Sequence, residues 1–155
     1  MNSNSEHTPL TTDLIALEGA PADKRGVIEF LLDLAVDADR VSDRDQAVED
    51  VLAREEESTT GVGMGIGIPH AKSGAVRSPT IVFTRVSDGV DFDAMDGEPA
   101  TLIFMLLVPE EGGEAHLQML SSLSRSLMHE ETRENLHEAE SEDRVRDIVL
   151  EAVEQ

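Results

Sequence analysis

The stretch Thr101-Leu-Ile-Phe-Met-Leu-Leu-Val108 gives the strongest strand signal in the chain. A continuous apolar run of this length, bounded by polar segments, is typical of a strand that is buried on both faces. Pro109 follows directly and ends the run, because proline has no N–H to donate to a neighbouring strand. The sequence therefore predicts a central sheet strand over 101–108.

Further strands are predicted on the N-terminal side of this run. The segment Thr80–Val86 has the composition of a second buried strand, and Ser87-Asp-Gly89 predicts a turn after it. Val90 and Phe92 indicate a short strand, and Asp96-Gly97 a further turn. The apolar alternation over Leu10–Leu17 is that of an edge strand.

Helical spacing of apolar residues flanks the strands on both sides. One helix is expected over residues 22–38, where Pro21 and Asp23 mark its start. A second is expected from about Asp43 to Glu56, with Ser42 as its N-cap and Asp45 three residues on. The C-terminal part has the same periodicity over 114–128, 130–138 and 141–153.

This order of elements predicts a single α/β domain in which a mixed sheet carries helices on both faces. The length of 155 residues is that of one ordinary domain, which needs no disulfide or structural metal to complete its core. Residues 1–9 are polar and are expected to form a mobile N-terminal arm. The folded domain is expected to cover residues 10–155.

The charge balance is strongly acidic and restricts the partners. Asp and Glu number 33 against 12 Lys and Arg, a formal net charge of −21. Nucleic-acid binding is disfavoured, because phosphate backbones require a basic footprint. The acidic residues are dispersed between apolar positions, which indicates a solvated folded surface adapted to high salt. A merely acidic protein without salt adaptation is the alternative.

Cysteine usage and the N-terminal segment bear on the cellular compartment. The chain contains no cysteine, which excludes disulfides and thiolate chemistry and fits a reducing compartment. No apolar run reaches the length of a membrane span, and the polar N-terminal segment does not have the pattern of a signal peptide. We expect a cytoplasmic protein without direct insertion into a membrane.

Glycines alternate with other residues in the stretch Gly61-Val-Gly-Met-Gly-Ile-Gly-Ile-Pro-His70. The spacing matches neither the dinucleotide-binding fingerprint nor a phosphate-binding Walker loop. Glycine at alternate strand positions allows another backbone or a ligand to approach closely, whereas Ile66 and Ile68 are expected to anchor the opposite face in the core. A bulged strand without a functional role is the other interpretation, and the glycines alone do not separate the two.

His70 is the strongest candidate for chemistry among the five histidines. Pro69 ends strand pairing and fixes the backbone that enters His70, so the imidazole is expected at a strand end, well placed for exposure. Neutral imidazole is a nucleophile when its other nitrogen holds a proton against an acceptor. His7 lies in the predicted arm, and His129 and His137 lie among acidic residues on helix surfaces, so His116, in the first turn of a helix, is the second candidate.

Four segments in order carry a resemblance to a known family. They are Arg54-Glu-Glu-Glu-Ser-Thr-Thr-Gly-Val-Gly-Met-Gly-Ile-Gly-Ile-Pro-His70, Asp88-Gly-Val-Asp-Phe-Asp-Ala-Met-Asp-Gly97, Phe104-Met-Leu-Leu-Val-Pro109 and His116-Leu-Gln-Met-Leu-Ser-Ser-Leu-Ser124. Together they resemble the type-2 enzyme IIA domains, the fructose–mannitol class, of the phosphoenolpyruvate-dependent sugar phosphotransferase system, in a haloarchaeal-like form. The resemblance covers the chain from about residue 10 to its C-terminus. Two departures from the family pattern are Gly67, where alanine is frequent, and Ala71, where glycine is frequent.

The resemblance implies a phosphocarrier with a mixed five-stranded sheet. His70 then accepts a phosphoryl group from the phosphocarrier protein HPr and passes it to a cysteine of enzyme IIB, which works with the membrane component enzyme IIC. The sugar is expected to be fructose or a related one, and no cofactor is implied. Arg54 and His116 match the other active-site positions of the family, and Nε2 is the implied phosphorylated nitrogen. A regulatory, nitrogen-type enzyme IIA, whose phosphorylation state controls binding partners, is the alternative.

The physical chemistry of these residues fits the implied roles, although other interpretations exist for each. The guanidinium of Arg54 suits phosphate oxygens, but an ion pair with Asp50 four residues earlier is an alternative. His116 can donate to phosphate or be a polar residue at a helix start. Met64, with Gly65 and Gly67, is expected to form a face that binds phosphate or a partner, since methionine adapts to more than one partner; core filling is the alternative for Met64. A metal site built on two histidines and a carboxylate is disfavoured, because the short spacings typical of metal ligands are missing from the sequence.

Overall fold

The computed structural model describes residues 9–57, 61–111 and 113–153, and in Gly61, Val62, Gly113, Ala115 and His116 only the backbone. Within these residues a short 3₁₀-helix and five α-helices alternate with strands. In chain order they are η2 (Thr12–Leu14), β1 (Ile15–Ala16), α1 (Lys24–Asp37), α2 (Arg44–Glu57), β2 (Gly61–Gly63), β3 (Ile66–Gly67), β4 (His70–Ser73), β5 (Thr80–Val90), β6 (Ala100–Pro109), α3 (Gly113–Leu127), α4 (Glu130–Glu138) and α5 (Glu142–Val153).

One mixed sheet holds all the strands of the described residues. Its order is β1-β5-β6-β3-β2, with β5 and β6 antiparallel and with β3 and β4 both parallel to β6. Because β3 pairs with Leu102 and Ile103 and β4 with Leu106 to Pro109, these two short strands lie end to end along one side of β6. The sheet is thus five strands wide, with one position interrupted, and the predicted fold class is confirmed.

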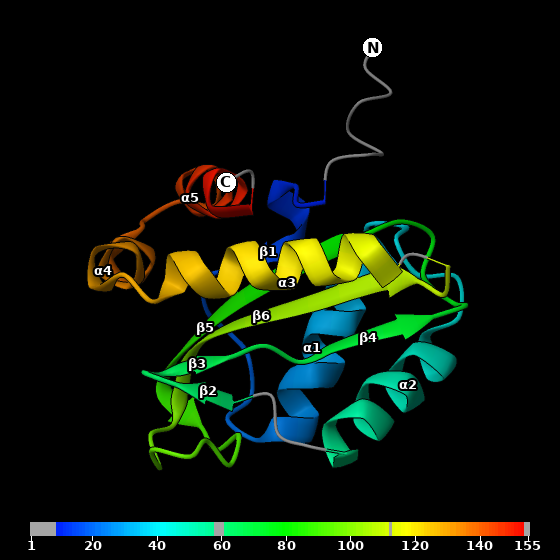
Figure 1. The fold of residues 1–155 in the computed structure, drawn as a ribbon, viewed down its shortest axis with the longest axis horizontal. Coiled ribbons are helices and arrows are strands. Elements are labelled where there is room, and N and C mark those ends of the chain that lie inside the picture. The colour runs from blue at the N-terminus through cyan, green and yellow to red at the C-terminus, as the bar shows by residue number, and fades with distance from the viewer. Residues whose placement is uncertain (1–8, 58–60, 112, 154–155) are drawn as a thin grey trace.

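Helices cover both faces of the sheet (Figure 1). α1 packs on β5 and on α2, and α2 also contacts β4; α3 packs on β6 and on α5 from the other side. The central strands are almost entirely buried, and the rings of Phe83 and Phe104 meet there with centroids 4.9 Å apart. Each such side chain contributes about 2 kcal/mol by leaving water. Among the described helices, none combines the length and the apolar character needed to cross a membrane.

The first two helices begin close to where the sequence predicts, but one predicted cap is wrong. Asp23 caps α1 and accepts a hydrogen bond from Gly26 N at 2.9 Å, as expected. At α2 the carboxylate of Asp43 accepts from Gln46 N, whereas the hydroxyl of Ser42 donates to the carbonyl of Ala75. Both residues are common N-caps, and the tertiary contact to residue 75 leaves the cap to Asp43.

Two strand predictions also differ in detail. The expected turn at 87–89 is an irregularity within β5, which continues to Val90, with Gly89 at φ 82°. The segment 10–17 forms η2 followed by only two strand residues, which pair with β5 at the edge of the sheet. Of the predicted N-terminal arm, residues 1–8 lie outside the described part of the chain; Pro9 accepts a hydrogen bond from Ile81 N. The division at residues 9 and 10 stays a prediction.

Candidate active site

The site begins at the interruption between β3 and β4. Ile68 and Pro69 separate the two strands, and Pro69 still accepts a hydrogen bond from Leu106 N at 3.0 Å. His70 is the first residue of β4 and stands in register with Leu106. The interruption leaves the carbonyl of Ile68 available to the imidazole two residues later.

This carbonyl fixes the protonation pattern of His70. Nδ1 of His70 lies 2.7 Å from the carbonyl oxygen of Ile68. A carbonyl oxygen can only accept, so Nδ1 carries the hydrogen and donates it. In the neutral ring the lone pair is then on Nε2, which is the nucleophilic nitrogen.

His70 is more buried than the sequence suggests, with only 8% of the residue exposed. Burial lowers the pKa of His70 below the usual 6.5; the Ile68 carbonyl opposes this, the positive charge of Arg54 adds to it, and the negative charge of Glu55 opposes it. The net direction is downward, so the imidazole is neutral at pH 7 and Nε2 keeps its lone pair.

Arg54 and Glu55 come from the last turn of α2. Arg54 is half-buried, and its charge is close enough to bias the protonation of His70, so the structure brings together these two sequence-predicted residues. Asp50, the alternative partner considered for Arg54, accepts a hydrogen bond from Gln46. Lys72, two residues after His70, is exposed to solvent.

His116, the other predicted histidine, lies in the first turn of α3. β4 and β6 run parallel and end together at Ser73 and Pro109, and α3 begins four residues after Pro109. The topology therefore carries the start of α3 to the end of the sheet at which β4 terminates. The side chain of His116 lies outside the described part of the structure, so its role stays a prediction.

The glycine-rich run is a hairpin and not the single strand expected from its alternation. β2 and β3 pair antiparallel, and the turn residues Met64 and Gly65 both have positive φ, 58° and 78°. Two left-handed residues in succession are the mark of the turn that joins twisted antiparallel strands. Asp96 accepts a hydrogen bond from Met64 N at 2.9 Å and fixes the turn to the β5–β6 connection.

Packing explains the glycines on either side of this turn. A Cβ on Gly63 would come within 2.8 Å of the Asp96 carboxylate. A Cβ on Gly67 would lie 3.3 Å from the ring of Phe92, and one on Gly65 3.3 Å from the hydroxyl of Thr101. Ile66 and Ile68 are buried in the core, as predicted. Met64 is 39% exposed, so its side chain is available at the surface.

Sequence reasoning missed three contributors to the site. The acceptor for His70 is a backbone carbonyl, which no residue type at position 68 would have revealed. Glu55 is buried beside Arg54, although three consecutive glutamates suggest a solvated surface. Asp96 stands before Gly97 in a predicted turn, and this aspartate–glycine pair was the one available signal for a carboxylate that binds backbone N–H groups.

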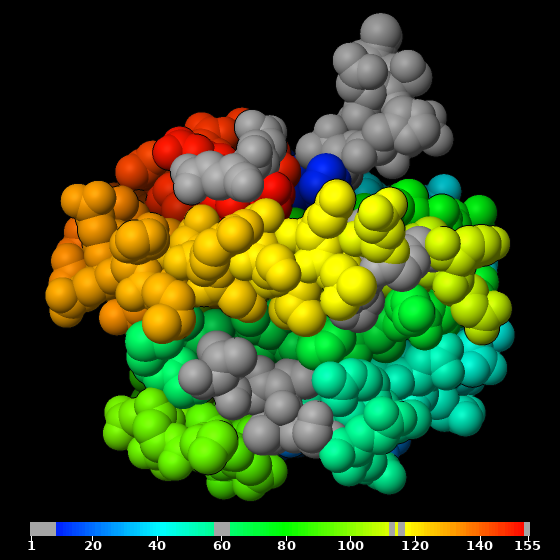
Figure 2. Space-filling model, in the orientation of Figure 1, coloured from blue at the N-terminus to red at the C-terminus, as the bar shows by residue number. Residues whose placement is uncertain are grey.

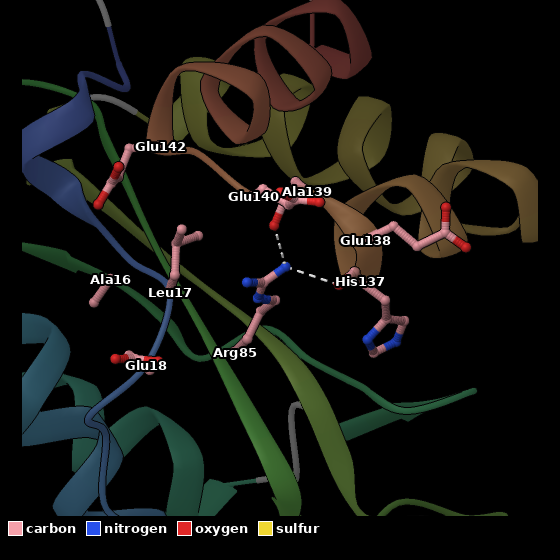
Figure 3. A pocket seen from close by; sticks show the side chains of 9 residues that line it. All are labelled: Ala16, Leu17, Glu18, Arg85, His137, Glu138, Ala139, Glu140 and Glu142. Atoms are coloured by element: carbon pink, nitrogen blue, oxygen red, sulfur yellow. Dashed lines mark hydrogen bonds between the residues drawn. The ribbon is translucent and has the colours of Figure 1, made fainter.

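A hollow elsewhere on the molecule contains a different arginine and histidine, Arg85 and His137 (Figure 3). It has a volume of about 640 Å³ and is lined by Ala16, Leu17, Glu18, Arg85, His137, Glu138, Ala139, Glu140 and Glu142. Nη1 of Arg85 donates to the carbonyls of Leu136, His137 and Ala139 at 3.0, 2.8 and 2.7 Å, which caps the C-terminal end of α4. Four glutamates line this hollow, and their negative charge disfavours the binding of phosphate. Across the described residues, no group of three His, Asp or Glu side chains is arranged to hold a metal ion.

A family model matches residues 8–152, and its description is phosphoenolpyruvate-dependent sugar phosphotransferase system, EIIA 2. The chain belongs to this family. A relative from Haloferax volcanii, the fructose-specific EIIA component of the system, is 64% identical over 147 residues, or 95% of this chain and 94% of the relative. The fructose-specific EIIABC component of Bacillus subtilis is 44% identical over 140 residues, which are 90% of this chain and 22% of that longer protein.

Solved structures agree with this assignment of the enzyme IIA family. The nitrogen regulatory protein IIA-Ntr from Neisseria meningitidis has a TM-score of 0.84 at 34% identity, covering 91% of this chain and 96% of its own. The mannitol IIA of Escherichia coli has a TM-score of 0.77 at 26% identity, covering 90% and 98%. As an enzyme IIA, the chain is a phosphotransferase component of the sugar phosphotransferase system.

Proposed function

We propose that this enzyme IIA accepts a phosphoryl group from phosphorylated HPr on Nε2 of His70 and transfers it to a cysteine of enzyme IIB. The observation that carries the proposal is the hydrogen bond from Nδ1 of His70 to the carbonyl of Ile68. It reserves Nε2 as the nucleophile, and the lowered pKa of His70 keeps that nitrogen unprotonated at neutral pH. No general base is therefore needed to deprotonate His70 before it attacks the phosphoryl group.

The two transfers balance without a cofactor. In the first, the lone pair of Nε2 attacks phosphorus, a new N–P bond forms, and the N–P bond to the HPr histidine breaks. HPr leaves as a neutral imidazole if its other ring nitrogen is protonated. His70 retains its Nδ1 proton, so its phosphorylated ring is cationic and is itself a good leaving group. In the second transfer a cysteine thiolate attacks, an S–P bond forms, and neutral His70 is regenerated.

Arg54 is proposed to stabilise the phosphoryl oxygens. Phosphoryl transfer asks a protein mainly for positioning and for stabilisation of oxygen charge. The guanidinium of Arg54 lies close enough to His70 to affect its pKa, and a planar cation suits this task. His116, at the start of α3, is proposed as a further donor to the phosphoryl group.

Both partners are proposed to dock over the face around His70, between the hairpin turn at one end of the sheet and the start of α3 at the other (Figure 1). In the space-filling view α3 crosses the face, with α2 and the β5–β6 connection below it (Figure 2). Met64 is exposed at the turn and Leu117 on α3 is 66% exposed, whereas Gly65 is half-buried and Gly67 is buried against Phe92. The structural neighbour from Escherichia coli that supports an enzyme IIB partner is a complex of IIA mannitol with phosphorylated IIB mannitol, with a TM-score of 0.78 at 25% identity.

Fructose is the proposed sugar, and the cytoplasm is the proposed location. Both the 64% and the 44% identical relatives are fructose-specific components. Relatives described as nitrogen regulatory proteins are 34 to 36% identical, so the regulatory alternative is not favoured. Enzyme IIC is then proposed as the membrane component that works with enzyme IIB.

Incubation with radiolabelled phosphoenolpyruvate, enzyme I and HPr, in molar KCl, tests the proposal. Label is expected on His70, and the His70→Gln variant should take up none, while a matched His137→Gln variant should label like the wild type. Mass mapping of the labelled peptide identifies the residue. Retained labelling in His70→Gln, or label mapped to another residue, would refute the assignment of His70.

A further inference from the structure

A buried ion pair stands directly beside the proposed site. Nζ of Lys24 lies 2.7 Å from Oε2 of Glu55, whose side chain is only 6% exposed, while the lysine side chain is 25% exposed. Glu55 is the carboxylate whose negative charge acts on His70. Lys24, from the first turn of α1, thus reaches the site through Glu55, from the last turn of α2.

The position of Lys24 is unfavourable for the helix that carries it. Lys24 is the first residue of α1, where the partial positive charge of the helix terminus disfavours a cation. The chain has only two lysines, Lys24 and Lys72. Nζ of Lys24 also lies 5.3 Å above the ring of Phe92 and 3.6 Å from the exposed carboxylate of Asp93. These contacts fix the ammonium group over Glu55 at a place where the helix itself does not stabilise it.

Phosphorylation changes the electrostatic problem at this point. The phosphoryl group adds negative charge next to a carboxylate, and a buried like-charge pair is strongly unfavourable. Arg54 supplies one positive charge, which must serve the phosphoryl oxygens. Glu55 is paired with a second cation, Lys24.

We propose that Lys24 is a positioning residue for phosphoryl transfer: its ion pair neutralises Glu55, so that the site can hold a phosphoryl group on His70. The inference rests on the proposed phosphorylation of His70. Arg54 and Glu55 act directly on the charge of His70, and Lys24 and Asp93 are linked to Glu55 through ion pairs of Lys24. The charged groups of the described residues in this neighbourhood are Arg54 and Glu55 from α2, Lys24 from α1, Asp93 from the β5–β6 connection and the exposed Lys72 from β4. Of these groups, Glu55 carries the buried negative charge.

The test compares Lys24→Met, Lys24→Arg, Glu55→Gln and the double variant Lys24→Met/Glu55→Gln at pH 8. Arg25→Met is the matched control, because it removes one cation from the same helix turn, where Arg25 pairs with the half-buried Glu29. The measured quantity is the equilibrium of phosphoryl transfer between stoichiometric phospho-HPr and each variant. Lys24→Met should shift it about tenfold toward HPr, the effect of one pKa unit of charge interaction.

The other variants separate the effect of the Lys24 charge on Glu55 from a structural effect of the ion pair on α2. Lys24→Arg and Arg25→Met should stay within about twofold of the wild type, since in both a cation still faces Glu55. The double variant should recover most of the loss, because the carboxylate is then gone as well. If the ion pair only holds α2 in place, the double variant will be no better than Lys24→Met, and the proposal is overturned.

A second readout does not depend on transfer. In NMR titrations the pKa of His70 should rise in Lys24→Met and fall in Glu55→Gln, and Glu55→Gln remains informative if Lys24→Met does not fold. Unchanged His70 titration in Glu55→Gln would also overturn the proposal. If the wild type itself takes up no phosphoryl group, the proposed function fails; if the wild type and Lys24→Met reach the same equilibrium, only the role of Lys24 fails.

Discussion

Two regions of the molecule place an arginine near a histidine, and they differ in the groups that each arginine and each imidazole contacts. At the end of α2, Arg54 lies near His70, whose Nδ1 is occupied by a carbonyl and whose Nε2 is reserved. At the end of α4, Arg85 donates to three carbonyls, and Nε2 of His137 lies within 3.4 Å of the Thr101 hydroxyl. In both places burial lowers the pKa of the histidine, and the arginine lowers it further.

The comparison shows that an arginine–histidine pair is not itself a phosphate site. Arg85 is committed to the backbone and surrounded by Glu18, Glu138, Glu140 and Glu142. At the other pair the one buried glutamate is matched by a lysine. The balance of charge, and the backbone carbonyl of Ile68 that holds Nδ1 of His70, separate the two regions.

Replacing the two arginines in turn is expected to give the largest difference. Arg54→Met should slow phosphorylation of His70 about a hundredfold, the usual cost of losing a group that stabilises developing oxygen charge, with little change in thermal stability. Arg85→Met should leave the transfer rate near that of the wild type but lower the free energy of unfolding by about 1–3 kcal/mol, because carbonyls at the end of α4 lose their donor.

Rapid-quench labelling from phospho-HPr and urea unfolding of the same two variants make the measurement. Equal transfer rates in Arg54→Met and the wild type would remove Arg54 from the proposed site. A large loss of transfer rate in Arg85→Met, at unchanged stability, would contradict the purely structural role of Arg85.

The pH dependence is the next largest effect. The lowered pKa of His70 means that phosphorylation should stay constant from pH 8 to 6.5 and fall only below the pKa of free imidazole, once Nε2 is protonated. The unfolded chain binds protons more readily than the folded one at both His70 and His137, so folding stability should also decline as pH falls below about 6.5. Nitrogen-15 NMR of the neutral rings should show Nδ1–H at His70; an Nε2–H tautomer there would contradict the proposed nucleophile.

A variant of Met64 tests whether partner proteins contact the hairpin turn. Met64→Ala should slow phosphorylation by phospho-HPr several-fold, because a partner loses an apolar contact at the hairpin turn. Met128, one residue after α3 and 63% exposed, provides the comparison variant Met128→Ala. Labelling by phosphoramidate, a small donor that needs no docking, should be equal in both. Unchanged HPr-dependent rates in Met64→Ala would reject its place on the docking face.

Added salt is expected to produce the smallest and most distributed effect. At a net charge of −21, screening should raise the melting temperature between low and molar KCl by several degrees. Hydrogen exchange should slow most in α4 and α5, where glutamates crowd Arg85, and least around the buried pair of Lys24 and Glu55. A melting temperature that is flat or falls with KCl would refute salt adaptation, which the similarity to a Haloferax volcanii protein supports.

Periodicity predicts most of the fold because each element buries a regular set of apolar residues. The run 101–108 and the helical spacing of residues 22–38 correspond to β6 and α1 within a few residues. The cap of α2 was missed because Ser42 and Asp43 have equal claims locally, and a contact with Ala75 decides between them. The hairpin was missed because methionine is not a turn residue.

The site was predicted unevenly for a similar reason. His70 and Arg54 are sixteen positions apart in one motif, and the structure brings them together. The ion pair of Lys24 with Glu55 joins two helices through residues that are far apart in sequence, and local pattern gives no sign of it. The carbonyl of Ile68 belongs to the backbone, so its role depends on where the strand is interrupted.

The turn at Met64 has a consequence for how this protein would respond to selection for stability. A left-handed conformation at a methionine costs about 1 kcal/mol relative to glycine, which adopts it freely. Glycine or asparagine at this position would therefore be favoured in a screen for heat resistance. If the Met64 side chain contacts a partner, such a screen would select variants that are more stable but bind their partners less well. Heat resistance and the rate of phosphoryl transfer are therefore expected to trade off at this one residue.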